Sequence, residues 1–143
     1  MSANQRSIIR RVKLTPGFHQ VDMMGVVHNC EYFHWFEEGR LQIMQEVIAL
    51  QDATELGVAA PVVENICRYF KFAGFGDSLL LTTIHKIVPV YQGKLKFSHS
   101  LVNEKTREEI ACGESTVTLI EFPSKKLLKE WPADLWVRYQ NLK

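Results

Sequence analysis

The sequence has little cysteine and no closely paired cysteine motif. Its 143 residues include three cysteines, an odd number, and none of them forms a CxxC pair. This pattern argues against a disulfide framework or a zinc ribbon and is typical of a chain in a reducing cytosol. Because free cysteine is usually buried, we expect Cys30, Cys67 and Cys112 to be small buried hydrophobic side chains.

The chain also lacks an excess of charge of either sign. Its net charge is +1 and no stretch is strongly basic, which argues against a nucleic-acid partner and leaves self-association electrostatically unopposed. Long hydrophobic runs are missing too: no segment has the length of a membrane span, and residues 1–11 lack the apolar core of a signal peptide. We therefore expect a cytoplasmic protein with no membrane span.

Several motifs that mark common enzyme classes are absent. The sequence has no GxSxG nucleophile elbow, no Walker loop and no GxGxxG turn, so serine hydrolase, P-loop and Rossmann readings lose their usual support. The histidines do not show metal-ligand spacing either, since no HxxxH or HxH pair converges with a carboxylate. We expect neither a metal nor a cofactor.

Five segments have the composition or the alternation of β-strands. In "KLKFSHSLV", large or apolar side chains and small or charged ones fall on opposite faces, with the period of two that a strand requires. Turn-forming residues separate the last four segments, and such short connections imply antiparallel neighbours. The predicted strands cover residues 7–15, 61–72, 78–90, 94–104 and 109–122.

A long helix is predicted between the first strand and the second. Asn29 can act as its N-cap, and residues 30–50 contain no proline and are apolar over most of the circumference, as in an enclosed helix. Gly39 inside it costs about 1 kcal/mol relative to alanine, which close packing would explain. Tyr32, Trp35 and Phe36 are expected in the core, and Glu37, Glu38 and Arg40 on a polar side with a local ion pair.

These elements predict one α+β domain over residues 1–143, with one long central helix wrapped by a curved five-stranded antiparallel sheet. A short C-terminal helix is expected after residue 130, with Pro132 near its first turn. The open edges of such a sheet favour pairing with a second protomer.

Asp22 is the first candidate for chemistry. It lies in apolar surroundings, about seven residues before the probable start of the helix, where backbone N–H groups lack intrahelical partners. A carboxylate near such donors could act on a water or on an electrophile, and donors aimed at a carbonyl oxygen would polarise it, as acyl transfer to water requires. Taken alone, Asp22 could equally stabilise a turn. Asn29 could be only a cap, and His28 could be structural or titrate near neutral pH.

The stretch "VDMMGVVHNCEYFHWFEEGR" resembles the signature of hotdog-fold acyl-CoA thioesterases of the 4-hydroxybenzoyl-CoA thioesterase type. Downstream, "RYFKFAGFGDSLLLTT" resembles the aromatic strand and Gly-Asp turn of that family, and the resemblance continues over residues 7–133. The signature is matched by Asp22, Gly25, Asn29, Tyr32, Phe36, Glu37, Glu38 and Arg40.

The resemblance implies a hotdog domain that works as a homodimer or homotetramer with active sites between protomers. It implies that Asp22 is the nucleophile or general base, and that a backbone N–H near Asn29 polarises the carbonyl. Substrate contacts are implied for Gly25, Val26, His28 and Tyr32. One position departs from the family: Gln20 stands where a second acidic residue is common.

The sequence thus leads to three hypotheses of different class. The first is a thioesterase that hydrolyses an acyl- or aroyl-CoA, or an acyl-carrier-protein thioester. The second is a thioester hydratase or dehydratase on the same fold, in which a histidine would pair with an acidic residue. The third is a non-catalytic module that binds acyl thioesters. Release of free thiol separates them.

Overall fold

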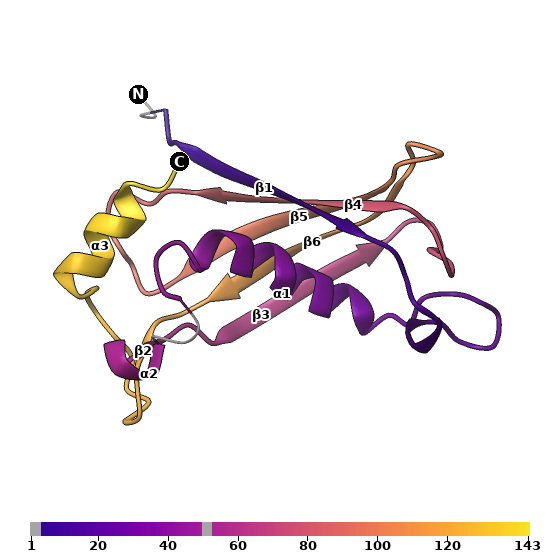
Figure 1. Ribbon diagram of the computed structural model, residues 1–143. Helices are drawn as coiled ribbons and strands as arrows, with labels where there is room; N and C mark the ends of the chain where they lie inside the picture. The colour runs from indigo at the N-terminus through magenta and orange to yellow at the C-terminus, as the bar shows by residue number, and fades with distance from the viewer. Residues whose placement is uncertain (1–3, 50–52) are drawn as a thin grey trace.

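A computed structural model describes residues 4–49 and 53–143. Its main feature is an antiparallel sheet of five strands, as predicted (Figure 1). Each strand is shorter than the segment that was predicted for it. The first and last strands in the spatial order are β1 and β3, which leaves one edge of each open. The order is β1 (Ser7–Leu14), β4 (Leu79–Lys86), β5 (Leu95–Asn103), β6 (Glu109–Val117) and β3 (Val62–Tyr69).

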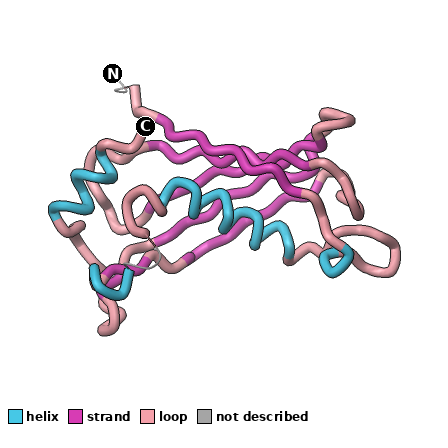
Figure 2. The backbone as a smooth tube through the Cα atoms, in the orientation of Figure 1, coloured by secondary structure: helices cyan, strands magenta, loops and turns pink. Residues whose placement is uncertain are grey.

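Helix α1 (Glu31–Met44) lies along one face of this sheet and contacts β1, β3, β4 and β5 (Figure 2). The prediction of a long helix to residue 50 is wrong, because α1 has 14 residues and gives way to turns after Met44. Residue 50 lies outside the described residues. Val47 and Ile48 remain buried in those turns. The apolar pattern therefore predicted correctly that these residues are buried, but not that they are helical.

The inner side of α1 confirms the predicted aromatic core. Tyr32, Trp35 and Phe36 are all buried. Gly39 is buried against β4, where a Cβ would overlap Thr83 Oγ1 and lie 3.1 Å from Leu81 Cδ2. Close packing therefore explains this glycine, although the neighbours are side chains rather than backbone.

Arg40 does not follow the prediction of an exposed polar helix side. It is buried, with 7% of its surface exposed, while Glu37 and Glu38 are exposed. Its Nη1 donates to Ser115 Oγ at 2.9 Å, and no ion pair with Glu37 or Glu38 is found among the described residues. Burial lowers the pKa of Arg40, and the charge of Glu37 partly opposes that. The local ion-pair prediction failed because helical spacing does not tell which side faces the sheet.

A buried polar chain continues from Ser115 across the sheet. His99 Nε2 lies 3.0 Å from Ser115 Oγ, and His99 Nδ1 lies 2.8 Å from Thr83 Oγ1. The His99 ring stacks on Phe36 with 4.3 Å between centroids. Burial, and then the charge of Arg40, lowers the pKa of His99 to about 3, so its ring is neutral at physiological pH.

Several small elements were not predicted. They span two to four residues each, too few for a periodic pattern, and two of them are strands that pair with each other across more than 60 positions. The predicted C-terminal helix is confirmed as α3 (Ala133–Gln140), and Pro132 is its N-cap, next to the first turn as predicted. The elements missed are η1 (Phe18–Gln20), α2 (Ala53–Leu56), β2 (Val58–Ala59) and β7 (Ile120–Glu121).

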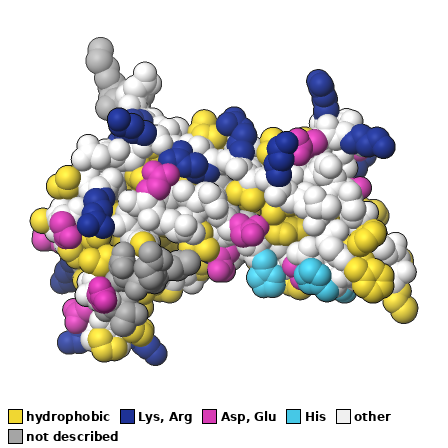
Figure 3. Space-filling view, in the orientation of Figure 1, with side chains coloured by type: hydrophobic (Ala, Val, Ile, Leu, Met, Phe, Trp, Pro, Cys, Tyr) yellow, Lys and Arg dark blue, Asp and Glu magenta, His cyan; other side chains and the backbone are white. Residues whose placement is uncertain are grey.

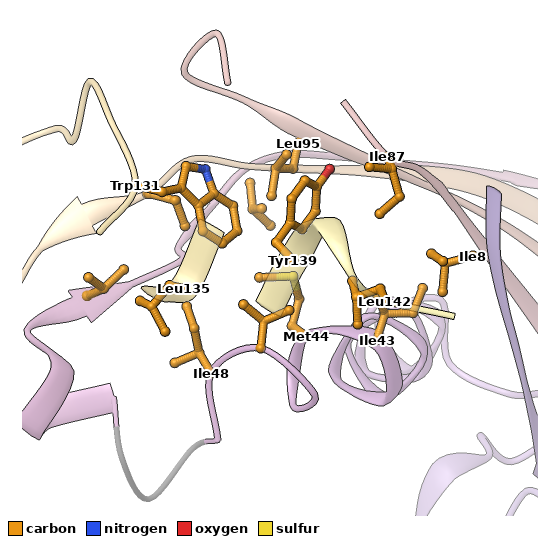
Figure 4. Close-up of a cluster of buried hydrophobic side chains, with 14 of the residues drawn as sticks. Ile8, Ile43, Met44, Ile48, Ile87, Leu95, Trp131, Leu135, Tyr139 and Leu142 are labelled. Carbon is orange, nitrogen blue, oxygen red and sulfur yellow. The ribbon is translucent and has the colours of Figure 1, made fainter. Parts of the chain in front are cut away.

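The hydrophobic core divides along α1 into two clusters. One surrounds the aromatic first half of the helix and includes Phe36 and Leu101. The other lies at the second half, where the C-terminal segment closes the layer: Figure 4 shows Tyr139 and Leu142 beside Ile43 and Met44. The two halves of one short helix therefore hold opposite ends of the sheet.

The cysteine prediction is wrong in its burial. Cys30 is exposed, and Cys67 and Cys112 are half-buried free thiols. Cys67 and Cys112 lie on β3 and β6, so their alternation within strands, rather than the general tendency of cysteine, decides their exposure. In the part of the chain that the structure describes, no helix is long and apolar enough to cross a membrane.

Candidate active site

The segment around Asp22 is held by backbone pairing on both sides. Val21 bridges Val27, and the N–H of His28 donates to the carbonyl of Gln20 at 2.9 Å, so residues 20–28 form a narrow hairpin leading into α1. The loop between β3 and β4 lies beside this hairpin, since the N–H of Val27 donates to the carbonyl of Ala73 at 2.9 Å. Figure 1 shows the hairpin at the end of the molecule opposite α3.

Asp22 is half-buried at the turn of this hairpin. Its Oδ1 accepts from the N–H groups of Met24 at 2.8 Å and Val26 at 3.1 Å, so the turn-stabilising interpretation is correct for this atom. Gly25 has φ +74°, a conformation that glycine adopts without strain, as a turn residue should. No hydrogen bond to Oδ2 of Asp22 is found among the described residues, which leaves that oxygen for another partner.

The start of α1 is not capped in the predicted way. The N-cap is Cys30, whose side chain makes no capping hydrogen bond, so the role assigned to Asn29 as a side-chain cap is wrong. His28 and Asn29 are exposed. The carbonyl of His28 accepts from the N–H of Glu31 at 3.1 Å, whereas within residues 4–49 and 53–143 the N–H groups of Cys30 and Tyr32 have no acceptor. Free donors therefore remain where the resemblance implies them.

Tyr32 lies in the core beneath the start of α1 and is not on the exposed surface of the site. It is 2% exposed, and burial raises the pKa of its hydroxyl. Its ring meets Trp35 at 5.2 Å and Tyr69 edge-on at 4.8 Å between centroids. Tyr32 is thus a supporting core residue of the site, and direct contact with substrate stays a prediction.

Three residues at this site were not predicted from the sequence. Tyr69, the last residue of β3, donates from its hydroxyl to the carbonyl of Asn29 at 2.9 Å. Gln20 accepts from the N–H of Gly17 at 2.9 Å and donates to Glu31 Oε2 at 3.0 Å, a bond that lowers the pKa of Glu31. Only the aromatic end of the predicted strand over residues 61–72 hinted at Tyr69, and nothing local pointed to the Gln20–Glu31 pair.

The surroundings of Asp22 are apolar and open. Hydrophobic side chains gather at this end of the molecule in the space-filling view (Figure 3). Phe18 in η1, just before the hairpin, and Phe75 meet edge-on at 6.2 Å between centroids, which joins η1 to the β3–β4 loop. The large exposed hydrophobic residues of η1, the hairpin and this loop are Phe18, Met23, Met24, Phe70, Phe72 and Phe75.

The described residues contain no group of three or more His, Cys, Asp and Glu side chains that could hold a metal ion. His85 and His99, two of the five histidines, are buried in the sheet far along β4 and β5, where His85 Nε2 lies 2.8 Å from the hydroxyl of Tyr139. The polar groups at this end of the molecule include the Asp22 carboxylate and the free backbone N–H groups at the start of α1. Such a set suits attack on, and polarisation of, a carbonyl.

Comparison with protein families identifies a superfamily for the chain. The model of the Thioesterase-like superfamily matches residues 16–138, which include the Asp22 hairpin, α1 and the whole sheet except β1. The chain belongs to this superfamily. This membership confirms the predictions of a thioesterase enzyme and of a hotdog fold; the narrower 4-hydroxybenzoyl-CoA type is not distinguished by it.

Individual proteins also resemble this chain, at low sequence identity. The "Putative acyl-CoA thioesterase YneP" of Bacillus subtilis (strain 168) is 24% identical over 123 residues, covering 80% of this chain and 86% of that protein. The 1,4-dihydroxy-2-naphthoyl-CoA thioesterase of Synechocystis superposes with a TM-score of 0.76 at 18% identity, over 94% of this chain and 97% of that one.

A hypothetical protein of Staphylococcus aureus, solved in complex with CoA, superposes with a TM-score of 0.77 at 15% identity, over 99% of this chain and 90% of that one. At these identities the two superpositions establish the fold alone. The roles of Asp22, Gly25, Val26, His28, Asn29 and Tyr32 therefore depend on the geometry around them.

Proposed function

We propose that the protein hydrolyses an acyl-CoA or aroyl-CoA thioester, or the corresponding acyl-carrier-protein thioester, to a free acid and a thiol. The observation that carries this proposal is the position of Asp22 on a hairpin that leads into the uncapped start of α1. Its Oδ1 is fixed by two backbone N–H groups while Oδ2 has no partner among the described residues. A carboxylate so held is preorganised to act.

In the proposed reaction Asp22 either attacks the thioester carbonyl directly or removes a proton from the attacking water. The free N–H groups near Asn29 donate hydrogen bonds to the carbonyl oxygen and stabilise the negative charge that develops on it. General-base assistance contributes about 10²–10⁴-fold to a rate, and an oxyanion donor about 10²–10³-fold. The thiolate of CoA or of the carrier protein then leaves. If Asp22 attacked the carbonyl, a water next hydrolyses the acyl–Asp22 anhydride, which frees the acid and restores the carboxylate. If Asp22 took a proton from the attacking water, the acid forms directly and that proton passes to the thiolate.

The remaining predicted residues have supporting roles in this proposal. Gly25 allows the turn that presents Asp22, and Val26 supplies one of the two N–H groups that hold its Oδ1. His28 is exposed one residue before Asn29 and so lies where a substrate would pass. Tyr32 supports the helix start from the core.

The site is proposed to be shared between two protomers. The Asp22 hairpin adjoins the loop that follows the end of β3, and β3 is an open edge of the sheet. Four apolar side chains are exposed on this edge beside one residue of each charge, Glu64 and Arg68, whereas the other edge strand, β1, carries the three basic residues Arg10, Arg11 and Lys13. Charged edges resist pairing and apolar ones favour it, so β3 is the edge that a second copy would cover. The exposed apolar residues of β3 are Val62, Val63, Ile66 and Tyr69.

A thiol-release assay tests this function. Purified protein is incubated with a panel of acyl-CoA esters that includes short, long and aromatic acyl groups, and free thiol is measured. We expect hydrolysis of at least one member without added metal or cofactor. Binding of CoA without thiol release would favour a binding module, and conversion of an enoyl-CoA with its thioester intact would favour a hydratase.

A further inference from the structure

Tyr69 connects the edge of the sheet to the start of α1. It is the last residue of β3, pairs with Ala111 of β6, and reaches 40 residues back along the chain to the carbonyl of Asn29. Its side chain is partly exposed, at 45% for the residue, and its ring rests edge-on against buried Tyr32. The hydroxyl is therefore anchored by packing on one side and by a hydrogen bond on the other.

The bond to Asn29 has a geometric consequence for Cys30. The carbonyl of Asn29 and the N–H of Cys30 belong to one planar trans peptide, in which the two groups point in opposite directions. A donor that fixes the carbonyl of Asn29 therefore fixes the direction of the Cys30 N–H. Within the described residues that N–H has no acceptor, and no side chain caps this end of α1.

The same bond also strengthens the Cys30 N–H as a donor. Hydrogen bonds in a chain polarise one another, so an amide whose carbonyl accepts a bond becomes a better donor at its nitrogen. Burial, first among several causes, raises the pKa of Tyr69 to about 12. The hydroxyl thus keeps its proton, and can donate, throughout the pH range in which thioesterases are assayed.

From this geometry we infer that Tyr69 is a positioning residue of the active site: it orients and polarises the Asn29–Cys30 peptide so that the Cys30 N–H stabilises the oxyanion of the thioester. The inference rests on the proposed function. Within that function it assigns the Cys30 N–H as an oxyanion donor and Tyr69 as the residue that orients it. Tyr69 acts through the peptide and need not touch the substrate.

Tyr69→Phe tests the inference because it keeps the ring against Tyr32 and removes only the hydroxyl. We expect kcat to fall about tenfold, as for loss of one hydrogen bond that matters in the transition state, with KM little changed. The dissociation constant for a non-hydrolysable CoA thioether should stay the same. In ¹H–¹⁵N spectra the Cys30 amide should shift upfield, a readout that does not depend on activity.

Tyr91→Phe is the matched control. The Tyr91 hydroxyl accepts from the N–H of Leu119 at 2.9 Å and lies on the loop between β4 and β5, away from the Asp22 hairpin. This variant should lose thermal stability and keep kcat. Tyr69→Phe should instead lose kcat and keep its melting temperature nearly unchanged.

The outcomes are distinguishable. If Asp22→Asn is inactive while Tyr69→Phe keeps the wild-type kcat and an unchanged Cys30 amide, the inference is overturned and the proposed function stands. A parallel loss of kcat, thioether affinity and melting temperature in Tyr69→Phe would also overturn it, because that pattern is one of general structural damage. If the wild-type protein releases no thiol from any ester, both are overturned.

Discussion

Asp22 carries the proposed chemistry although its hydrogen bonds are those of an ordinary turn. The N–H groups of Met24 and Val26 both bond to Oδ1. These two bonds hold the carboxylate in one orientation and leave Oδ2 to meet a water or a carbonyl carbon. A turn contact and a catalytic role are therefore compatible for this residue, since preorganisation needs a fixed group.

A second residue with an unusual environment is His99, for which we predict a pH-dependent stability. Burial lowers the pKa of His99 from 6.5 to about 3 in the folded protein. Between these values the unfolded chain binds a proton that the folded chain does not. The free energy of unfolding should fall by up to about 1.4 kcal/mol for each pH unit below 6.5. Denaturant titrations between pH 4.5 and 7 measure this slope.

His99→Gln should flatten that slope, and His34→Gln should not. His34 is exposed on α1, so it serves as the control for removal of a histidine. His85, whose pKa is also lowered by burial, keeps part of the slope in both variants. Equal slopes for His99→Gln and the wild type would contradict the buried neutral state of His99.

The Asp22–Gly25 turn could be predicted from sequence because the hydrogen bonds of Asp22 are local, although two other local predictions, the Asn29 cap and the Arg40 ion pair, were wrong. The Asp22–Gly25 turn is contained in four residues, and its chemistry follows from residue types that favour turns. The contacts that were missed join residues far apart: Tyr69 to Asn29 over 40 positions and Arg40 to Ser115 over 75. Spacing along one segment carries no information on such pairs.

At the scale of elements, periodicity predicted which segments are strands better than where a helix ends. The alternation in β5 survives as a regular pattern of buried and exposed side chains. In α1 the apolar pattern runs beyond Met44 because Val47 and Ile48 fill the same cluster from a turn. Core residues are both helical and buried along α1, whereas after Met44 they are still buried but no longer helical. Hydrophobicity alone does not show where the helix ends.

Gly39→Ala tests the contact between α1 and β4. Alanine gains about 1 kcal/mol of helix propensity over glycine. Its methyl group would, however, overlap Thr83 Oγ1 and crowd Leu81, and overpacking of this kind costs about 1–3 kcal/mol. We expect a lower free energy of unfolding in denaturant titration despite the better helix former.

Glu38→Ala is the control on the same helix. Glu38 is exposed, so this change should alter stability by no more than about 0.5 kcal/mol. A Gly39→Ala protein more stable than the wild type would show that α1 and β4 are less closely packed than described.

At the scale of the whole molecule, the two open edges of the sheet differ in character. β1 carries three basic residues and one exposed isoleucine, whereas β3 exposes four apolar residues together with Glu64 and Arg68, and the Asp22 hairpin lies near the end of β3. The open edges were predictable from the strand count. Which edge is apolar depends on the strand order, with β3 at an edge although it is third among the strands along the chain.

Ile66→Lys on β3 should weaken self-association, and Ile9→Lys on β1 should not. The two isoleucines are matched, since each is 41% exposed and each lies on an edge strand. We expect the wild type and Ile9→Lys to sediment as dimers or larger species and Ile66→Lys to shift toward the monomer. Thiol release should fall with the dimer if the site is shared.

A monomeric wild-type protein at assay concentrations would contradict the shared site. Loss of the dimer in Ile9→Lys, with Ile66→Lys unaffected, would assign the interface to the opposite edge of the sheet.

Thiol release by Asp22→Asn tests the proposed function most directly. Asparagine keeps the size of the side chain and an oxygen that can accept from Met24 and Val26, and it removes the negative charge. Asp134→Asn, an exposed position on α3, removes the same charge elsewhere. On an ester that the wild type hydrolyses, we predict a loss of about 10²–10⁴-fold in kcat for Asp22→Asn and none for Asp134→Asn. An Asp22→Asn enzyme with the wild-type kcat would contradict the catalytic role of Asp22.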